Sequence, residues 1–151
     1  MARGDESAYA GGVIGYISQL SSDSYVKNTL IECPIEGTKV VGGLIGYSHI
    51  ASDSATLHIE NSSVASIVIG DNIAGGFVGS FDQAGQLNFS GKCNVMVMEE
   101  GTVDVRGGDC VGGMIGVIST PNALSVDNQS LIHISTNVSG RELVGGLVGD
   151  M

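Results

Sequence analysis

The residues best suited to chemistry lie in one acidic segment, MEEGTVDVRGGD, which covers residues 98–109. It contains four acidic residues and one basic residue: Glu99, Glu100, Asp104 and Asp109 with Arg106. Clustered carboxylates with a basic partner are what a carbohydrate-cleaving enzyme needs, and calcium also favours carboxylate oxygens. The spacing matches neither an EF-hand nor the glycine–aspartate repeat of a β-roll. We interpret the segment as a solvated acidic loop, and calcium binding by residues 99–109 stays open.

The other reactive side chains are dispersed. The remaining loop acids are spread along the chain at Asp23, Glu36, Asp53, Asp71, Asp82 and Asp127. The histidines are isolated at His49, His58 and His133, and the cysteines stand at Cys33, Cys93 and Cys110. No CxxC or Cys/His spacing indicates a metal site, and we interpret the thiols as small buried apolar groups. The sequence therefore predicts no catalytic residue, no metal site, no cofactor and no enzyme.

Two short motifs resemble known binding sequences, but their sequence context favours a structural role. The tripeptide Arg3-Gly4-Asp5 has an integrin-binding sequence, but it occupies the same place as the turn VRGGD before a later motif. The segment VVGGLIGYS at residues 40–48 looks like a phosphate-binding glycine loop. It lacks the GK[ST] ending and the following helix of such loops. Both are interpreted as local backbone chemistry.

The double glycine recurs five times, which makes this a repeat protein. It occurs in YAGGVIGYI, VVGGLIGYS, IAGGFVGSF, CVGGMIGVI and LVGGLVGDM, whose first paired glycines are separated by 31, 33, 37 and 33 residues. These motifs contain 15 of the 24 glycines. They are Gly11, Gly12, Gly15, Gly42, Gly43, Gly46, Gly75, Gly76, Gly79, Gly112, Gly113, Gly116, Gly145, Gly146 and Gly149. We expect them to allow tight turning or close approach of an adjoining layer.

The segments around the glycines read as β-strands. Apolar and polar residues alternate with a period of two, and β-branched residues are abundant. Short all-β repeats cannot bury a face alone and must stack on their neighbours. A propeller blade needs four strands and about 40–45 residues. We therefore predict an all-β fold, a parallel right-handed β-solenoid with about three short strands in each repeat of about 33 residues.

The repeats divide the chain into four full units and a partial fifth. We place them at about 9–39, 40–72, 73–109, 110–142 and 143–151, within one repeat domain over residues 1–151. The third unit is longer than the others because the acidic segment is an insertion. A start and a stop inside the pattern suggest a fragment of a longer protein.

Composition excludes several classes of partner. The net charge is −10, with only 6 lysines and arginines, which argues against nucleic acid and anionic membrane surfaces. No apolar run approaches the roughly 20 residues of a membrane span. The segment MARGDESAYAGG lacks the apolar core of a signal peptide.

Two columns of equivalent residues are candidates for special roles. Asn28, Asn61 and Asn128 hold one position in successive second strands, with Gly91 in the third repeat. Stacked amides at strand spacing can form a hydrogen-bonded ladder, whereas the alternative is a set of surface turn residues. The second column follows the double glycines: Val13, Leu44, Phe77, Met114 and Leu147. Its neighbours are apolar on both alternation sets. Either the glycines bend the chain so that both sets are buried, or this column is an exposed stripe for a partner.

The repeated motif resembles the GLUG family of bacterial surface proteins and of β-solenoid regions in IgA-cleaving metallopeptidases. All five motifs match its GGΦΦG core, so the resemblance covers essentially the whole chain. It implies an extracellular location at a bacterial cell surface and a role as scaffold or adhesive module. The metallopeptidase HExxH motif is not present.

We therefore predict a non-enzymatic scaffold or adhesin segment, acting as a stalk or interaction module. Its expected partners are a protein or glycan ligand at a host or neighbouring-cell surface. Open solenoid ends with unpaired strands also predict self-association. The alternatives are a self-assembling filament or oligomer subunit, and a fragment of a carbohydrate-active β-helix enzyme.

Overall fold

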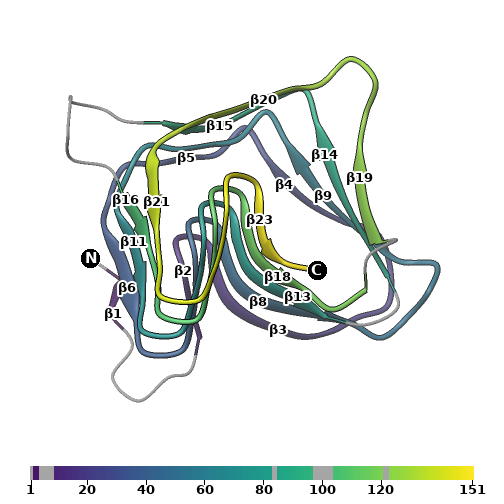
Figure 1. Cartoon of the computed structure of the whole chain (residues 1–151). Helices are drawn as coiled ribbons and strands as arrows, with labels where there is room; N and C mark the ends of the chain where they lie inside the picture. The colour runs from purple at the N-terminus through teal and green to yellow at the C-terminus, as the bar shows by residue number, and fades with distance from the viewer. Residues whose placement is uncertain (1, 4–8, 83–84, 97–103, 121–122) are drawn as a thin grey trace.

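The chain coils into a parallel β-solenoid, as the repeats predict. The computed structural model describes residues 2–3, 9–82, 85–96, 104–120 and 123–151. Each full turn of the coil contributes one strand to each of five parallel sheets, rather than the three strands expected from the sequence. The chain runs counter-clockwise as it approaches the viewer in Figure 1, which makes the coil right-handed.

Sheets A, B and C have five strands each. Sheet A contains β1 (Ala2–Arg3), β6 (Ile35–Gly37), β11 (Val68–Gly70), β16 (Asp104–Arg106) and β21 (Asn137–Ser139). Sheet B contains β2 (Tyr9–Gly11), β7 (Val40–Gly42), β12 (Ile73–Gly75), β17 (Cys110–Gly112) and β22 (Leu143–Gly145). Sheet C contains β3 (Ile14–Leu20), β8 (Ile45–Ile50), β13 (Val78–Asp82), β18 (Ile115–Ile118) and β23 (Val148–Asp150).

Sheets D and E have four strands each. Sheet D contains β4 (Ser24–Lys27), β9 (Thr56–Glu60), β14 (Gln86–Ser90) and β19 (Leu124–Val126). Sheet E contains β5 (Leu30–Ile31), β10 (Ser63–Val64), β15 (Lys92–Met96) and β20 (Leu131–Ser135). The strands are short because a corner follows each of them. Two or three neighbouring strands therefore form one continuous stretch of alternating apolar and polar residues, which the sequence pattern predicts as a single strand.

The register places equivalent residues of successive turns in columns along the coil axis. In sheet A, Val68 is paired with Ile35 on one side and with Val105 on the other. Parallel strands lie about 4.8 Å apart, so each buried side chain packs on its equivalents above and below. The repeats predicted from the sequence begin at residues 40, 73, 110 and 143. These are the first residues of β7, β12, β17 and β22.

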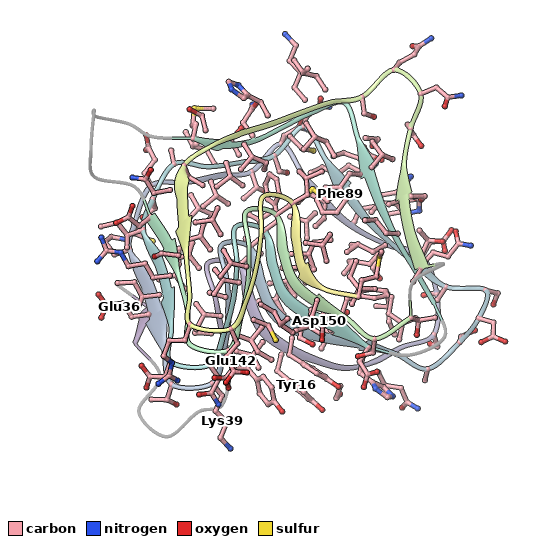
Figure 2. All side chains as sticks on the ribbon, viewed as in Figure 1. Tyr16, Glu36, Lys39, Phe89, Glu142 and Asp150 are labelled. Atoms are coloured by element: carbon pink, nitrogen blue, oxygen red, sulfur yellow. The ribbon has the colours of Figure 1, made fainter. Side chains whose placement is uncertain are left out.

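Inward-facing columns fill the interior with aliphatic and phenyl side chains. Ile31, Val64 and Val95 line sheet E, and Ile59 and Phe89 line sheet D, all of them buried. Figure 2 shows Phe89 inside the coil, whereas the carboxylate of Glu36 points outward. Alternation with a period of two thus directs one set of side chains to the core and the other to solvent.

The main chain itself also fills part of the interior, because the turns fold inward between sheets B and C. The strand of sheet B runs into the middle of the coil, reverses at the double glycine and returns along sheet C (Figure 1). We call this element the inward bend. It has no counterpart in a simple hollow coil, and it accounts for the apolar residues on both alternation sets.

The long third repeat departs from the others between β15 and β16. Residues 97–103, which include Glu99 and Glu100, lie outside the described part of the structure, as do residues 4–8 with the end of the Arg3-Gly4-Asp5 tripeptide. Within the residues that the structure describes, no helix has the length and apolar character needed to cross a membrane.

Candidate functional site

The glycines of the inward bend let backbone meet backbone. A Cβ atom on Gly42 would lie 1.9 Å from the carbonyl oxygen of Ile45 and 2.6 Å from the amide nitrogen of Gly79. The first and third glycines of the motif therefore let the two limbs of the bend touch. A Cβ on the second glycine, Gly43, would lie 2.0 Å from the oxygen of Gly76 and 2.7 Å from a methyl group of Val64 on sheet E. The tip of the bend thus crosses the interior and reaches the opposite wall.

The bend is braced from turn to turn by main-chain hydrogen bonds. The amide of Leu44 donates to the carbonyl of Phe77 at 2.9 Å, and the amide of Ile45 donates to the same oxygen at 3.0 Å. Val13, Phe77 and Met114 repeat the first bond to the next turn at 2.8–2.9 Å. The repeated glycine motif is therefore a structural device of the scaffold.

Of the two alternatives for the column after the double glycines, the exposed stripe is wrong for the middle of the chain. Leu44, Phe77 and Met114 are buried, whereas Val13 and Leu147 are about half exposed because they belong to the first and last turns. The phenyl ring of Phe77 packs against Phe89, with ring centroids 5.5 Å apart. The inward bend turns the three middle members of the column into the core, which is the other alternative left open by the sequence.

The expected asparagine ladder is also absent from the described residues. Asn28 and Asn61 have φ angles of 51° and 45°, and Gly91 has 68°. They share a left-handed corner between sheets D and E, where asparagine and glycine are favoured. The side-chain oxygen of Asn61 accepts a hydrogen bond from the amide of Lys92 at 3.1 Å rather than from another asparagine. Asn128 lies in the same corner one turn after Gly91, but in a longer exposed turn after Val126 and without a positive φ angle.

A polar ladder does run across the outer face of sheet D, but its surfaces are already occupied. The ring of Tyr25 stacks on His58 at 4.5 Å, and the amide of Asn88 contacts His58 at 3.4 Å. Lys27 lies 4.0 Å from the Tyr25 ring centroid and pairs with Glu60 at 3.1 Å. Both faces of the exposed tyrosine are thus in contact with neighbours, which leaves little platform for a ligand.

A tyrosine cluster closes the mouth of the inward bend in the first two turns. The rings of Tyr9, Tyr16 and Tyr47 have centroids 4.9–5.3 Å apart, and Figure 2 shows Tyr16 beside this mouth. The hydroxyl of Tyr47 donates to Asp82 at 2.9 Å. Burial, followed by this carboxylate, raises the pKa of Tyr47 to about 12. A neutral, fixed phenol of this kind has a structural role in packing the bend.

A surface groove lies at the corner between sheets A and B. It has a volume of about 420 Å³. Its lining comes from three successive turns: Ile69, Gly70, Asp71, Asn72, Arg106, Gly107, Gly108 and Arg141. We call it the corner groove.

The corner groove exists because one position of the corner column has no side chain. The corner sequences are GDN, GGD and GRE in three successive turns. Asp71, Gly108 and Arg141 occupy the same position in these three corners. A Cβ on Gly108 would lie 2.1 Å from the oxygen of Asp71 and 2.6 Å from Nη2 of Arg141. Gly108 therefore forms the floor, and the guanidinium of Arg141 extends over it.

The two arginines of the corner groove each hold one carboxylate and remain exposed. Arg106 pairs with Asp104, and Arg141 lies 3.4 Å from Asp109. Their side chains are 58% and 73% exposed. A guanidinium has five N–H donors, so a single ion pair leaves donors for a ligand. Within the described residues, the side chains of Asp71 and Asn72, which line the groove, make no hydrogen bond.

The acidic segment singled out from the sequence thus contributes to the corner groove through its second half. Asp104, Arg106 and Asp109 lie at or beside it, while the isolated loop acids Asp23, Asp53 and Asp127 lie elsewhere. Sequence reasoning missed the groove as a site. The one signal was the extra glycine of VRGGD, aligned with GDN and GRE in the neighbouring repeats.

The cysteines occupy three different environments. Cys93 is buried, as expected, and burial raises the pKa of its thiol. Cys33 is exposed and Cys110 is partly exposed, so the expectation of three buried thiols is wrong for Cys33. Burial, followed by Asp150, also raises the pKa of Cys110. None of the described cysteines forms a disulfide.

The two ends of the coil present unpaired strands, but they do not match fully. Leu143, Val144 and Leu147 are about half exposed in the last turn, as is Val13 in the first. Sheets A, B and C each have one strand more than sheets D and E. A second copy stacked in register would pair sheets A, B and C and leave one strand position open over sheets D and E.

Comparison with family models, with curated proteins and with solved structures found no match for this chain. The resemblance to the GLUG family therefore stays a prediction from the five motifs.

Proposed function

We propose that this chain is a non-enzymatic scaffold segment of a bacterial cell-surface protein, which acts as a stiff spacer and presents ligand-binding corners. The proposal rests on the GLUG-like motifs for location and on the braced inward bend for the mechanical role. An adhesive module needs a rigid body between the surface and its ligand, and a coil whose interior is filled by its own backbone supplies one.

The inward bend is the observation that carries the scaffold role. Each turn donates amides from the bend tip to the next turn. The main chain packs so closely here that a Cβ atom on Gly42, Gly43 or Gly46 would lie only 1.9, 2.0 or 2.5 Å from a carbonyl oxygen. These contacts cross the interior as well as following the axis. The coil is thus tied along its length and across its width, which opposes both bending and flattening.

The mechanical role is tested by pulling the chain along its axis. We expect a cooperative unfolding event at a force well above that of a variant in which Gly43→Ala and Gly76→Ala loosen the bend. A chain that extends gradually at low force, in the same way as the variant, would contradict the role of spacer.

The cell-surface location and the absence of enzymatic activity need separate tests. Antibodies against this chain should label intact cells that produce it, without permeabilisation. Purified chain should release no product from a panel of acidic and neutral polysaccharides. Labelling only after permeabilisation would contradict the surface location, and cleavage of any polysaccharide would contradict the non-enzymatic role.

A further inference from the structure

The corner groove combines two exposed guanidinium groups with free acceptors in one hollow. Arg106 and Arg141 come from consecutive turns, and Asp71 lies one turn before Arg106 at the level of Gly108. Arginine is suited to binding carboxylates through two parallel hydrogen bonds. Two of only 6 basic residues in a chain of net charge −10 therefore meet at this hollow.

The remaining lining matches hydroxyl groups rather than further acids. The side chains of Asp71 and Asn72 offer acceptors and an amide donor, as the hydroxyls of a sugar ring require. Gly70, Gly107 and Gly108 have no side chains, so a ring can approach the main chain closely. The groove volume of about 420 Å³ lies in the range of small-ligand sites.

The same lining disfavours an acidic peptide. Asp71 lies in the groove, and Asp104 and Asp109 lie beside its arginines, so a run of carboxylates would meet like charge. Ile69 is the only apolar side chain among the lining residues, which leaves little surface for peptide side chains. A uronic acid residue carries one carboxylate with several hydroxyls, and this ratio fits the two arginines and their neighbours.

We propose that the corner groove binds an acidic saccharide, with the carboxylate of a uronic acid residue held by Arg141 and Arg106 and its hydroxyls held by Asp71 and Asn72. This deepens the proposed adhesive role, on which it rests, by naming the ligand class. Binding requires no covalent step and no cofactor.

The test is a calorimetric titration of the full chain with a short saccharide oligomer that contains one uronic acid residue. The control ligand is the same oligomer with its carboxylate methyl-esterified. We expect saturable binding of the acid form, and at least tenfold weaker binding for the ester and for Arg141→Gln. Lys39→Gln is the matched control variant, because it removes one positive charge from an exposed corner residue that does not line the groove. It should bind the acid form as the parent chain does.

Thermal unfolding of both variants shows whether they remain folded, since Arg141 has only one exposed ion pair to lose. No binding of the acid oligomer, equal binding of the ester, or unchanged binding by Arg141→Gln would each overturn the proposal. An oligoglutamate peptide that binds as tightly, with the same loss in Arg141→Gln, would overturn the saccharide class. Because the pulling experiment uses no ligand, failure here leaves the spacer role standing.

Discussion

The carbonyl oxygen of Gly76 lies 2.0 Å from the position that a Cβ atom on Gly43 would occupy. The same relationship links Gly12 to Gly43 at 2.5 Å and Gly113 to Gly146 at 2.2 Å. The second glycine of these motifs is thus required by the following turn, and also by a sheet E side chain of its own turn, such as Val64 at 2.7 Å from the Gly43 Cβ position. In the last described turn, a Cβ atom on Gly146 would meet nothing within 4 Å.

This difference between the two glycines predicts unequal losses of stability for the same glycine-to-alanine substitution. Gly43→Ala should lower the free energy of unfolding by at least about 2 kcal/mol, because its neighbours are main-chain and packed methyl groups that cannot move aside. Gly146→Ala should change it by less than about 0.5 kcal/mol. Urea denaturation of both variants measures the difference, and equal losses would contradict these close contacts as the reason for the second glycine.

The column after the double glycines offers a second matched pair. Leu44 is fully buried, whereas Leu147 is 54% exposed at the equivalent position. Leu44→Ala should cost about 2–5 kcal/mol through lost burial and a cavity, and Leu147→Ala less than about 1 kcal/mol. If denaturation shows both variants near the parent chain, Leu44 does not lie in the core.

The left-handed corner predicts the response of Asn28. Its φ angle of 51° is strained for alanine but free for glycine. Asn28→Ala should lower the free energy of unfolding by about 1 kcal/mol, while Asn28→Gly should stay within about 0.5 kcal/mol of the parent chain. An amide ladder would instead make both substitutions equally harmful, which thermal or urea denaturation would reveal.

The partly buried phenol of Tyr47 predicts a loss of stability in strong alkali. Its folded-state pKa of about 12 lies above the usual value of about 10. The folded state therefore holds this proton more tightly than the unfolded state. Its contribution to stability is complete below about pH 10 and is lost as the pH rises towards 12.

Ultraviolet absorbance of tyrosinate in pH jumps measures that titration. In Tyr47→Phe the component that titrates near pH 12 should disappear. Asp82→Asn should move it to lower pH only in part, because burial is the larger cause and the hydrogen bond to Asp82 the smaller one. An absorbance titration identical in the parent chain and Tyr47→Phe would contradict the assignment.

Much of the fold could be predicted from the sequence, because a solenoid repeats its contacts. The spacing of about 33 residues and the alternation of side chains predict parallel columns, and sheet A shows them in the pairing of Ile35 with Val68 and Val68 with Val105. The candidate site was not predictable in the same way. Asp71, Gly108 and Arg141 come from three repeats, and the extra glycine of VRGGD indicates a groove only when the three corners are stacked on one another.

The sequence by itself determined the period, the all-β class and the positions where main chain must approach main chain, because glycine and alternating side chains encode local geometry. Only the tertiary structure decided what lies beside those positions. Leu44 and Val41 sit on opposite alternation sets and are both buried because the chain folds into its own interior. Asn61 faces Gly91 rather than an asparagine. In both cases the deciding contact joins residues about one turn apart, and it depends on how successive turns are aligned.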